Sequence, residues 1–454
     1  MGIGLHGGGV ATVRFFSDAG SKVIATDMKT EKELALSLEK LKDLKNITFV
    51  LGQHRMEDFT NVDMVVKGPA VPWNSKHIQA AIKKKIPVEM DSSLFFKLCK
   101  LPIIGITGTK GKTTTATLVA EILKTAGKKV FTVGVGQKPV LSVLDEITVD
   151  KNGVIVFELS SWRLSALGRA NLSPHIGVIT NIHQDHLNYY GTMEKYIADK
   201  KYIFLNQKEG DFAVLNCDNE SVRNLAEQTK SKVIFFTANA EVDINNDYVG
   251  VKEGKVFYQS ESEERIICDI NDIKLRGGHN LYNVLAAIAA TLVYGVASDK
   301  ICEAVKNFKG VGHRLELICE LDGVKYYNDT AATVPDAAIA GVNSFSEKLV
   351  LIAGGADKNL DFKNFAEAIA SKVRRLVLLK GEATEKLKTE LAKIGKEKMI
   401  DSEFSNMEKA VTRAKNLAGP GDIVLLSPGA ASFGLFLNEF DRGDKFREAV
   451  GKLK

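Results

Sequence analysis

Apolar and polar positions alternate over the first hundred residues in a rhythm of short strands and helices. The pattern predicts a helix over 10–19 (VATVRFFSDA), a strand at 22–27, and further strands at 62–67 and 87–90. Strands that are separated by helices pair in parallel, and the helices cover the faces of the sheet. The first segment is therefore predicted to be a doubly wound α/β domain.

The same rhythm restarts near residue 100. An apolar strand at 101–107 leads through a glycine loop into a helix that begins near Lys112, and apolar strands follow at 154–158 and 176–180. The polar stretch 243–265 has turn residues and short β-rich runs, which favour a hairpin within this unit. A helix over 280–294 ends at Gly295, as glycine commonly ends helices.

A third α/β unit begins after residue 308. Its pattern predicts a helix over 337–344 and strands at 324–328, 349–353, 375–379 and 422–426. With 454 residues, the chain is too long for one hydrophobic core. We expect three domains, over residues 1–98, 99–308 and 309–454, and the fold class is α/β throughout.

Composition narrows the classes of function. The chain is 45% hydrophobic and 26% charged with a net charge of +5, which is too mild for a nucleic-acid-binding surface. It has no apolar run of the roughly 20 residues that cross a membrane, and no signal-peptide pattern. Its five cysteines form no CxxC pattern, which favours a reducing compartment. We expect a cytoplasmic enzyme that acts on small anions, without nucleic acid and without membrane insertion.

The sharpest motif is a glycine and lysine loop, Gly105-Ile-Thr-Gly-Thr-Lys-Gly-Lys-Thr-Thr114, between a strand and a helix. Glycines let backbone N–H groups turn toward phosphate oxygens, and the start of a helix adds positive partial charge. We predict an ATP site here, with Lys112 on the terminal phosphates and the Thr113 hydroxyl on Mg²⁺. The predicted ATP-binding residues of the loop are Gly108, Thr109, Lys110, Gly111, Lys112, Thr113 and Thr114.

A second glycine pattern, Gly2-Ile-Gly4-Leu-His-Gly7, stands at the start of the chain, and Asp27 ends a strand 20 residues after Gly7. Alone, this pattern is a dinucleotide fingerprint and allows an NAD-dependent oxidoreductase. The strand that should precede it is almost absent, because Met1 falls inside it. With an ATP loop elsewhere in the chain, we favour a UDP moiety over NAD as the ligand of this domain.

Polar residues follow two later strands. Glu158 ends the strand 154–158 within ELSS, and His183-Gln-Asp185-His186 follows the strand 176–180. Such strand ends collect functional residues in α/β sheets, and Glu158 and His186 together could hold Mg²⁺. Lys200 lies on a predicted helix over 195–202, where residue chemistry alone favours a solvated side chain.

These blocks together resemble the Mur ligases, the ATP-dependent amide-bond-forming ligases of bacterial cell-wall synthesis. The resemblance rests on the ATP loop, on ELSS, TNI-x-x-DH and Y-x-x-x-K, and on later blocks in family order. These later blocks are HNLYN (279–283), GHRLE (312–316), NDT (328–330), AGGADK (353–358), LLSPGAAS (425–432) and DRG (441–443). The resemblance covers nearly the whole chain and is strongest to the members that add glutamate to UDP-N-acetylmuramoyl-L-alanine.

The resemblance implies the architecture and the nucleotide chemistry. It implies an N-terminal Rossmann-like UDP domain, a central ATPase domain and a C-terminal Rossmann-like domain. Lys112, Glu158, His186 and Lys200 would be the catalytic residues. Lys200 would be carbamylated, and two Mg²⁺ ions would be held by Thr113, Glu158, His186 and the Lys200 carbamate. Asn283, Arg314 and Asp329 would complete the ATP site.

The resemblance also implies the substrates: ATP, UDP-N-acetylmuramoyl-L-alanine and glutamate, bound by a monomer. The alanine carboxylate would attack the γ-phosphate of ATP, and the amine of glutamate would then attack the acyl phosphate. Glutamate would contact Thr333, Lys358 and Ser432. The UDP-substrate would contact Leu5, His6, Met28, Lys29, Gly68, Gln137 and Ser160.

The chain departs from the family pattern at four places. Ala331 stands where the family has a lysine, Glu439 replaces an aromatic residue beside Phe440, and Arg163 replaces a glutamine. The loop 134–137 matches the family's substrate loop only loosely. These departures concern the amino-acid and UDP-substrate pockets, so a ligase for L-glutamate or another amino acid stays open. A folylpolyglutamate synthase is disfavoured, because it lacks the glycine-rich first domain.

Overall fold

The computed structural model describes residues 1–5, 7–136, 138–148, 152–239 and 246–453. The chain forms two compact units, each described below by itself. One unit comprises Met1–Ile273 with Tyr282–Lys306, and the other comprises Lys274–Leu281 with Asn307–Lys454. The domain limits predicted near residues 98 and 308 stay predictions. No helix among these described residues is long and apolar enough to cross a membrane.

The N-terminal part of the first unit has parallel strands, but they form two small sheets and not the single doubly wound sheet that we predicted. In one sheet β1 pairs with β2, and in the other β3 pairs with β4. The segment Met1–Gly2 is hydrogen-bonded to both sheets, because Gly2 N donates to Thr26 O and the Met1 amine donates to Val66 O. The elements are β1 (Val23–Asp27), β2 (Ile47–Leu51), β3 (Val65–Val66), β4 (Val88–Glu89), α1 (Gly8–Asp18), α2 (Glu31–Glu39), α3 (Glu57–Thr60), α4 (Lys76–Lys83) and α5 (Asp91–Leu98).

The central part of the first unit is built on a nine-stranded sheet of order β13-β12-β11-β10-β9-β8-β5-β7-β6. The strands from β6 to β11 are parallel, and β11, β12 and β13 form an antiparallel edge. This edge confirms the predicted hairpin region within its described residues. The strands are β5 (Ile103–Thr107), β6 (Lys129–Val133), β7 (Gly153–Glu158), β8 (Ile176–Ile179), β9 (Phe212–Asn216), β10 (Lys232–Phe236), β11 (Tyr248–Lys252), β12 (Lys255–Gln259) and β13 (Glu264–Asp269).

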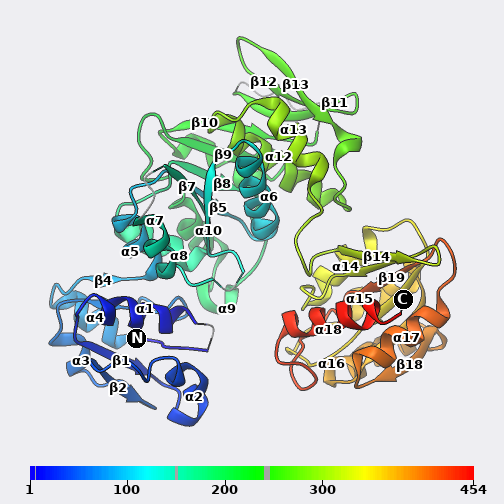
Figure 1. The fold of residues 1–454 in the computed structure, drawn as a ribbon, viewed down its shortest axis with the longest axis horizontal. Helices are drawn as coiled ribbons and strands as arrows, with labels where there is room; N and C mark the ends of the chain where they lie inside the picture. Colours follow the sequence, from blue (N-terminus) through cyan, green and yellow to red (C-terminus); the bar gives the residue numbers. More distant parts are fainter. Residues whose placement is uncertain (6, 137, 149–151, 240–245, 454) are drawn as a thin grey trace. The chain divides into compact units, whose positions relative to one another are not determined.

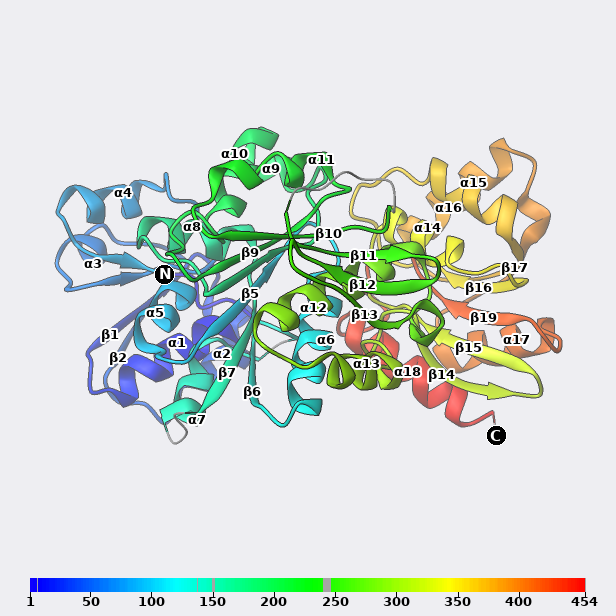
Figure 2. The same ribbon diagram turned by 90° about the horizontal axis from the view of Figure 1, so that it is seen from above.

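Helices cover both faces of this sheet, with α6 and α12 on one side and α8 and α10 on the other (Figures 1 and 2). The strands β5, β7 and β8 are buried on both faces, as their continuous apolar sequences require. The helices are α6 (Lys112–Thr125), η1 (Leu141–Val143), α7 (Leu144–Thr148), α8 (Ser161–Arg169), α9 (Leu187–Tyr190), α10 (Met193–Lys201), α11 (Glu220–Arg223), η2 (Ala226–Gln228), η3 (Ile270–Asp272), α12 (Gly278–Val293) and α13 (Ser298–Asn307).

The second unit holds a six-stranded sheet of order β14-β15-β19-β16-β17-β18, parallel except for β14. Apolar clusters lie on both faces of this sheet. Its strands are β14 (Glu316–Leu321), β15 (Val324–Asn328), β16 (Leu349–Ala353), β17 (Val373–Leu379), β18 (Ile400–Phe404) and β19 (Ile423–Leu426). Its helices are α14 (Pro335–Asn343), α15 (Lys363–Lys372), α16 (Glu382–Lys393), η4 (Glu397–Met399), α17 (Met407–Leu417) and α18 (Glu439–Gly451).

Candidate active site

The glycine loop joins the C-terminal end of β5 to the start of α6, as predicted. Gly111 precedes the helix with a φ of +85°, in the left-handed region that favours glycine. A Cβ on Gly111 would collide with the Asn283 side chain, and one on Gly108 would collide with the Thr180 side chain. Both glycines are therefore required for close packing as well as for the turn.

A second loop, after β8, holds the glycine loop in place. The Lys110 N–H donates to Asn181 Oδ1 at 2.9 Å, and the Asn181 side-chain amide donates back to Lys110 O at 3.1 Å. Thr180 Oγ1 also donates to Lys110 O at 2.6 Å. The Thr109 hydroxyl accepts from His183 N at 3.0 Å. The TNIH sequence therefore shapes the loop, and His183 does so through its backbone.

Lys112 is the first residue of α6, and its ammonium folds back over the loop. Nζ donates to the carbonyl oxygens of Gly108 and Thr109, both at 3.0 Å. A lysine at the positive end of a helix is placed to meet an anion. This position is the one predicted for the terminal phosphates of ATP.

Two of the predicted metal ligands meet directly. The Thr113 hydroxyl donates to Glu158 Oε2 at 2.8 Å. The contact arises because β5 and β7 are neighbouring parallel strands, so the loop after β5 and the last residue of β7 share one sheet edge. A carboxylate and a hydroxyl are oxygen ligands of the kind that Mg²⁺ prefers.

His186 lies at the start of the short helix α9 with a positive φ of 52°. Its imidazole is partly exposed and contacts two aromatic side chains: the Trp162 ring centroid lies 4.9 Å away and the Tyr196 centroid 6.1 Å away. Burial lowers the pKa of His186, an effect that Asp185 opposes and Lys112 adds to. The neutral imidazole is the form that ligates metals.

Lys200 is buried, with 1% of its surface exposed, which contradicts the solvated lysine expected from residue chemistry alone. Nζ donates to Gly108 O at 2.9 Å and lies 4.7 Å from the Tyr196 ring centroid. Burial, followed by repulsion from Lys112, holds the pKa of Lys200 well below its ordinary value. A lysine on α10 thus reaches the phosphate loop, where burial disfavours its charged form.

Within the described ranges, no three His, Cys, Asp or Glu side chains come together as a metal site. The predicted set contains two such side chains, Glu158 and His186, beside a threonine and an unmodified lysine. The roles of Thr113, Glu158, His186 and Lys200 toward Mg²⁺ therefore stay predictions. The oxygen pair at Thr113 and Glu158 and the neutral amine at Lys200 fit such a site.

Polar residues that the sequence analysis missed extend this sheet edge. The sequence Asn216-Cys-Asp-Asn219 begins at the last residue of β9; Asn216 Nδ2 donates to Thr180 O at 2.8 Å, and Asn219 Oδ1 accepts from Ile182 N at 3.3 Å. Asp218 accepts hydrogen bonds from Thr237 Oγ1 at 2.6 Å and Ala238 N at 2.8 Å. An N-x-D-N pattern directly after an apolar strand was the signal for these residues. Tyr196 and Trp162 gave no comparable signal.

The remaining predicted ATP residues come from two places. Thr114 and Asn283 are buried in the first unit, and Asn283 O accepts from the Thr115 hydroxyl at 3.4 Å. Arg314 and Asp329 belong to the second unit. Asp329 is buried, and its carboxylate accepts from Ser427 Oγ at 2.7 Å and Leu315 N at 3.2 Å. Burial raises the pKa of Asp329 to about 7.

The three residues predicted for glutamate lie on three loops that follow β15, β16 and β19. These strands are neighbours in the sheet, and the loops are joined by hydrogen bonds. Gly429 N donates to Ala332 O at 2.9 Å, and Ala356 and Ala431 exchange two bonds of 3.0 and 3.1 Å. Ser432 is buried, Thr333 is half-buried and Lys358 is exposed. Phe440, which could replace the family's aromatic residue, packs 5.6 Å from the His313 ring.

The UDP-substrate residues lie at strand and helix ends in the first unit. Leu5 and Met28 are exposed by 50% and 63%, and Lys29 is exposed beside them in sequence. Gly68 N donates to Met1 O at 2.8 Å. Ser160 caps α8 by accepting from Arg163 N at 3.3 Å. His6 and Gln137 lie outside the described residues.

The oxidoreductase interpretation depends on Asp27, which would have to bind a ribose. Its two carboxylate oxygens instead accept from Gly4 N at 3.0 Å and Lys29 N at 2.9 Å. Asp27 therefore fastens the glycine loop to the end of β1. Asp27 was the main support for the dinucleotide fingerprint, and in this structure its hydrogen bonds stabilise the glycine loop.

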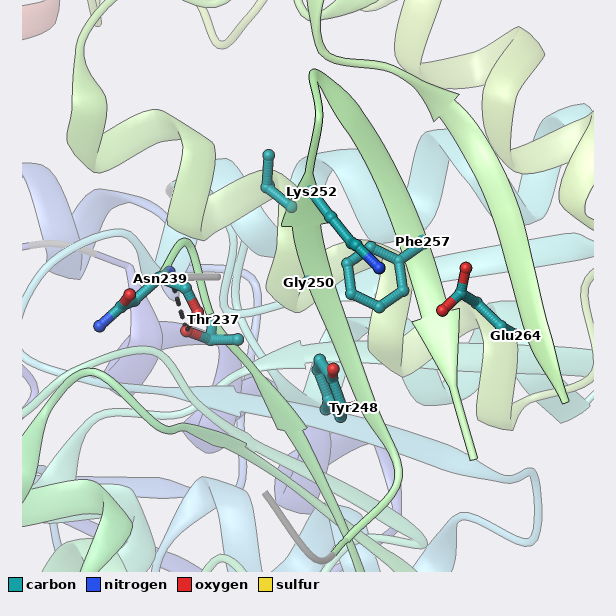
Figure 3. A pocket seen from close by; sticks show the side chains of 8 residues that line it. Thr237, Asn239, Tyr248, Gly250, Lys252, Phe257 and Glu264 are labelled. Carbon is teal, nitrogen blue, oxygen red and sulfur yellow. Dashed lines mark hydrogen bonds between the residues drawn. The ribbon is translucent and has the colours of Figure 1, made fainter. Parts of the chain in front are cut away.

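A small cavity in the central sheet lies elsewhere. It has a volume of 120 Å³ and is lined by residues of β11–β13 and the end of β10, among them Thr237, Tyr248, Phe257 and Glu264 (Figure 3). None of the predicted site residues lines it. The nucleotide site is thus recognised by its loop geometry.

A phosphate loop in a parallel α/β sheet, with a carboxylate and a buried lysine at the same sheet edge, defines a nucleotide-dependent group-transfer enzyme. Three family models match the chain: the MurD-like N-terminal domain over residues 1–89, the Mur ligase middle domain over 106–291, and the Mur ligase glutamate ligase domain over 313–429. The chain belongs to the Mur ligase family and has its three-domain α/β architecture.

Curated relatives narrow this assignment. The chain is 45% identical over 99% of its length to the UDP-N-acetylmuramoylalanine–D-glutamate ligase of Roseiflexus sp., of which it covers 97%. It is 38% identical, over its whole length and 97% of the relative, to the protein of the same name from Borreliella afzelii. Among solved structures, the UDP-N-acetylmuramate–alanine ligase of Thermotoga maritima shares the fold, with a TM-score of 0.60 and 21% identity over 100% of this chain and 98% of that one.

Proposed function

We propose that this chain joins D-glutamate to UDP-N-acetylmuramoyl-L-alanine at the expense of ATP, a step of peptidoglycan precursor synthesis. The supporting observation is that Thr113, Glu158 and Lys200 all meet the phosphate loop at one sheet edge. The full-length identity to relatives of that name supports the choice of substrates. The choice between D-glutamate, L-glutamate and another amino acid is made by this identity and not by the pocket geometry.

The chemistry needs an activated carboxylate, because a carboxylate and an amine do not condense at neutral pH. The alanine carboxylate attacks the γ-phosphate, the bond to the ADP oxygen breaks, and an acyl phosphate forms. The amine of glutamate then attacks the acyl carbon, loses a proton, and inorganic phosphate leaves. The protein contributes positioning and electrostatic stabilisation to both steps.

The residues around the loop suit the first step. Backbone N–H groups at the start of α6 face the phosphates in our proposal, whereas the Thr109 and Lys110 N–H groups donate to Asn181. In the ATP complex, the Lys112 ammonium exchanges the Gly108 and Thr109 carbonyls for phosphate oxygens. This exchange places positive charge where negative charge moves during phosphoryl transfer.

Magnesium completes this site in our proposal. Thr113, Glu158, His186 and a carbamate on Lys200 would hold two Mg²⁺ ions, which would neutralise charge on the phosphates. The low pKa of Lys200 supports the carbamate, because CO₂ reacts with the neutral amine. A carbamate converts this buried amine into an anionic oxygen ligand beside the phosphate loop.

Glutamate binds in our proposal to the linked loops of the second unit. Lys358 is exposed and binds a glutamate carboxylate, while the Ser432 and Thr333 hydroxyls supply hydrogen bonds. Phe440, whose ring centroid lies 5.6 Å from that of His313, could still supply the aromatic residue that Glu439 replaces. Leu5, His6, Met28, Lys29, Gly68, Gln137 and Ser160 hold the UDP-substrate. We further propose that the enzyme acts as a monomer in the cytoplasm.

The decisive experiment measures release of inorganic phosphate from ATP and Mg²⁺ by the full chain. UDP-N-acetylmuramoyl-L-alanine is supplied with D-glutamate, L-glutamate or another amino acid in turn. Release that depends on D-glutamate is the expected result. Release with L-glutamate alone would reassign the amino acid, and no release with any amino acid would refute the ligase proposal.

A further inference from the structure

Trp73, in the N-terminal part of the first unit, is held between two cations. The Lys67 ammonium lies 4.6 Å from the centroid of its ring, and the Arg169 guanidinium lies 4.2 Å from it. Lys67 is 2% exposed, donates to Val71 O at 2.9 Å, and has a pKa that burial lowers to about 8. Cations over an indole face are attracted to it, so the ring has a fixed place against α8.

From Trp73 a path of hydrogen bonds runs into α8. The indole Nε1–H donates to Ser165 Oγ at 2.7 Å, and the Ser165 hydroxyl donates to Trp162 O at 2.6 Å. The direction of the path is fixed, because an indole N–H can only donate. Ser165 is buried, so water does not compete for its hydroxyl. Trp162 belongs to the first turn of α8, directly after the ELSS motif.

The other end of the path is the predicted metal ligand. The Trp162 ring packs 4.9 Å from the His186 imidazole at an interplanar angle of 49°, and 5.7 Å from the Tyr189 ring. Tyr196 provides a second aromatic contact to the imidazole. The rest of the His186 side chain is partly exposed, so these ring contacts limit the orientations that its imidazole can adopt.

We propose that Trp73 is a positioning residue for the ligase reaction, which acts on the His186 imidazole through Ser165 and the ring of Trp162. The inference rests on the proposed function for its kinetic consequence only. It assigns to the N-terminal domain a task beyond holding UDP: its tryptophan orients a side chain at the sheet edge where the carboxylate is activated.

The kinetic test uses two variants that cut the path at different bonds. Trp73→Phe keeps an aromatic ring between Lys67 and Arg169 but removes the N–H, and Ser165→Ala removes the relaying hydroxyl. Because catalysis is sensitive to displacements well below 1 Å, we expect each to lower kcat about 10-fold, with the KM for ATP within about twofold. The double variant should lose no more than either single one, since both break one path.

Ser92→Ala is the matched control. The Ser92 hydroxyl also ties a neighbouring helix to α8, by donating to Arg163 O at 3.1 Å, but it has no bond to Trp162. We expect its kcat to stay within about twofold of the parent chain. An equal loss in Ser92→Ala, or losses that add in the double variant, would mean that α8 is merely destabilised, and would overturn the proposal.

A second measurement needs no activity. The His186 imidazole lies 4.9 Å from the Trp162 ring, whose ring current contributes to the NMR shift of the His186 Hε1 proton, assigned with His186→Asn. The shift should move in Trp73→Phe and Ser165→Ala alike and stay unchanged in Ser92→Ala. An unchanged resonance in both path variants would refute the coupling. If the parent chain releases no phosphate, the proposed function fails, while this spectrum still decides the coupling.

Discussion

Each unit has a cation with almost no exposed surface, and these two cations differ in their hydrogen-bond acceptors and in the charges around them. Arg442 on α18 has no exposed surface, and Lys200 on α10 has 1%. The Arg442 guanidinium donates to Thr330 Oγ1, Thr330 O and Ala430 O at 2.9–3.0 Å. Burial lowers the pKa of Arg442 to about 10, so it stays charged at neutral pH.

Lys200 has a poorer set of acceptors and a like charge nearby. Its one short hydrogen bond is to Gly108 O, the contact with Thr107 Oγ1 is 3.4 Å long, and Lys112 repels it. A buried cation with matched acceptors stabilises a fold, whereas a buried amine that is easily neutralised is available for chemistry. From this difference we expect Arg442 to be structural, and the catalytic role of Lys200 stays a proposal.

The largest effect is expected for Lys200→Ala, which tests the proposed catalytic role of Lys200. We expect kcat to fall about 10³-fold or more, because a ligand for the second Mg²⁺ is lost, while the melting temperature changes little. Phosphate release is the measurement, repeated with acetate or formate, which should restore part of the rate if a carbamate is missing. The neighbouring half-buried lysine, which donates to Gln228 Oε1, provides the control as Lys201→Ala. Full activity of Lys200→Ala would remove this residue from the mechanism.

Arg442→Met tests the structural half of the comparison. The variant leaves Thr330 Oγ1, Thr330 O and Ala430 O without their donor, so we expect the free energy of unfolding to fall by about 3–5 kcal/mol. Urea unfolding followed by circular dichroism measures this change. Arg413→Met, at an exposed arginine paired with Asp401, should cause a far smaller change. Equal effects in the two variants would contradict the assignment of Arg442.

Asp329 extends the comparison of buried cations to a buried acidic group. Its pKa of about 7 in the folded chain exceeds the ordinary value of 3.8, so folding takes up a proton between these pH values. Its contribution to stability is therefore full below pH 4 and declines as the pH rises to 7. Asp329→Asn does not titrate, so its stability relative to the parent should rise by about 2–4 kcal/mol from pH 4 to pH 8.

The measurement is the free energy of unfolding of both chains in urea at several pH values. Asp422→Asn, which removes a buried carboxylate that is paired with Arg374 in the same unit, is the control. A stability difference between Asp329→Asn and its parent that does not vary with pH would show that Asp329 is ionised throughout.

The sequence predicted the phosphate loop and its meeting with Glu158 well. Both follow from local rules: glycines set the loop, and neighbouring parallel strands end at one edge. The burial of Lys200 could not be predicted from residue chemistry alone. The helix α10 has the sequence MEKYIADKK, and this sequence does not show which of its lysines lies under β5. Arg442 was found only as part of the DRG block, since its acceptors lie more than 10 residues away in sequence.

The ligand and the strand limits of the N-terminal part were harder to predict, because they too depend on contacts that the sequence does not show. Its glycine pattern is short and fits two ligands, and only the hydrogen bonds of Asp27 distinguish a structural acid from a ribose-binding one. The strand predicted at 62–67 is reduced to Val65–Val66. Strand limits depend on which backbone groups find partners, and a hydropathy pattern does not carry that information.

The division of α12 between the two units has a practical consequence for dissecting the enzyme. Residues 274–281 belong to the second unit, where Arg276 pairs with Glu347 at 2.8 Å and packs over Tyr327 and Phe345. A fragment that starts at residue 309 would expose these two rings and leave Glu347 unpaired. A recombinant glutamate-binding half should therefore carry the 274–281 peptide, grafted or added in trans, before its behaviour is compared with that of the whole enzyme.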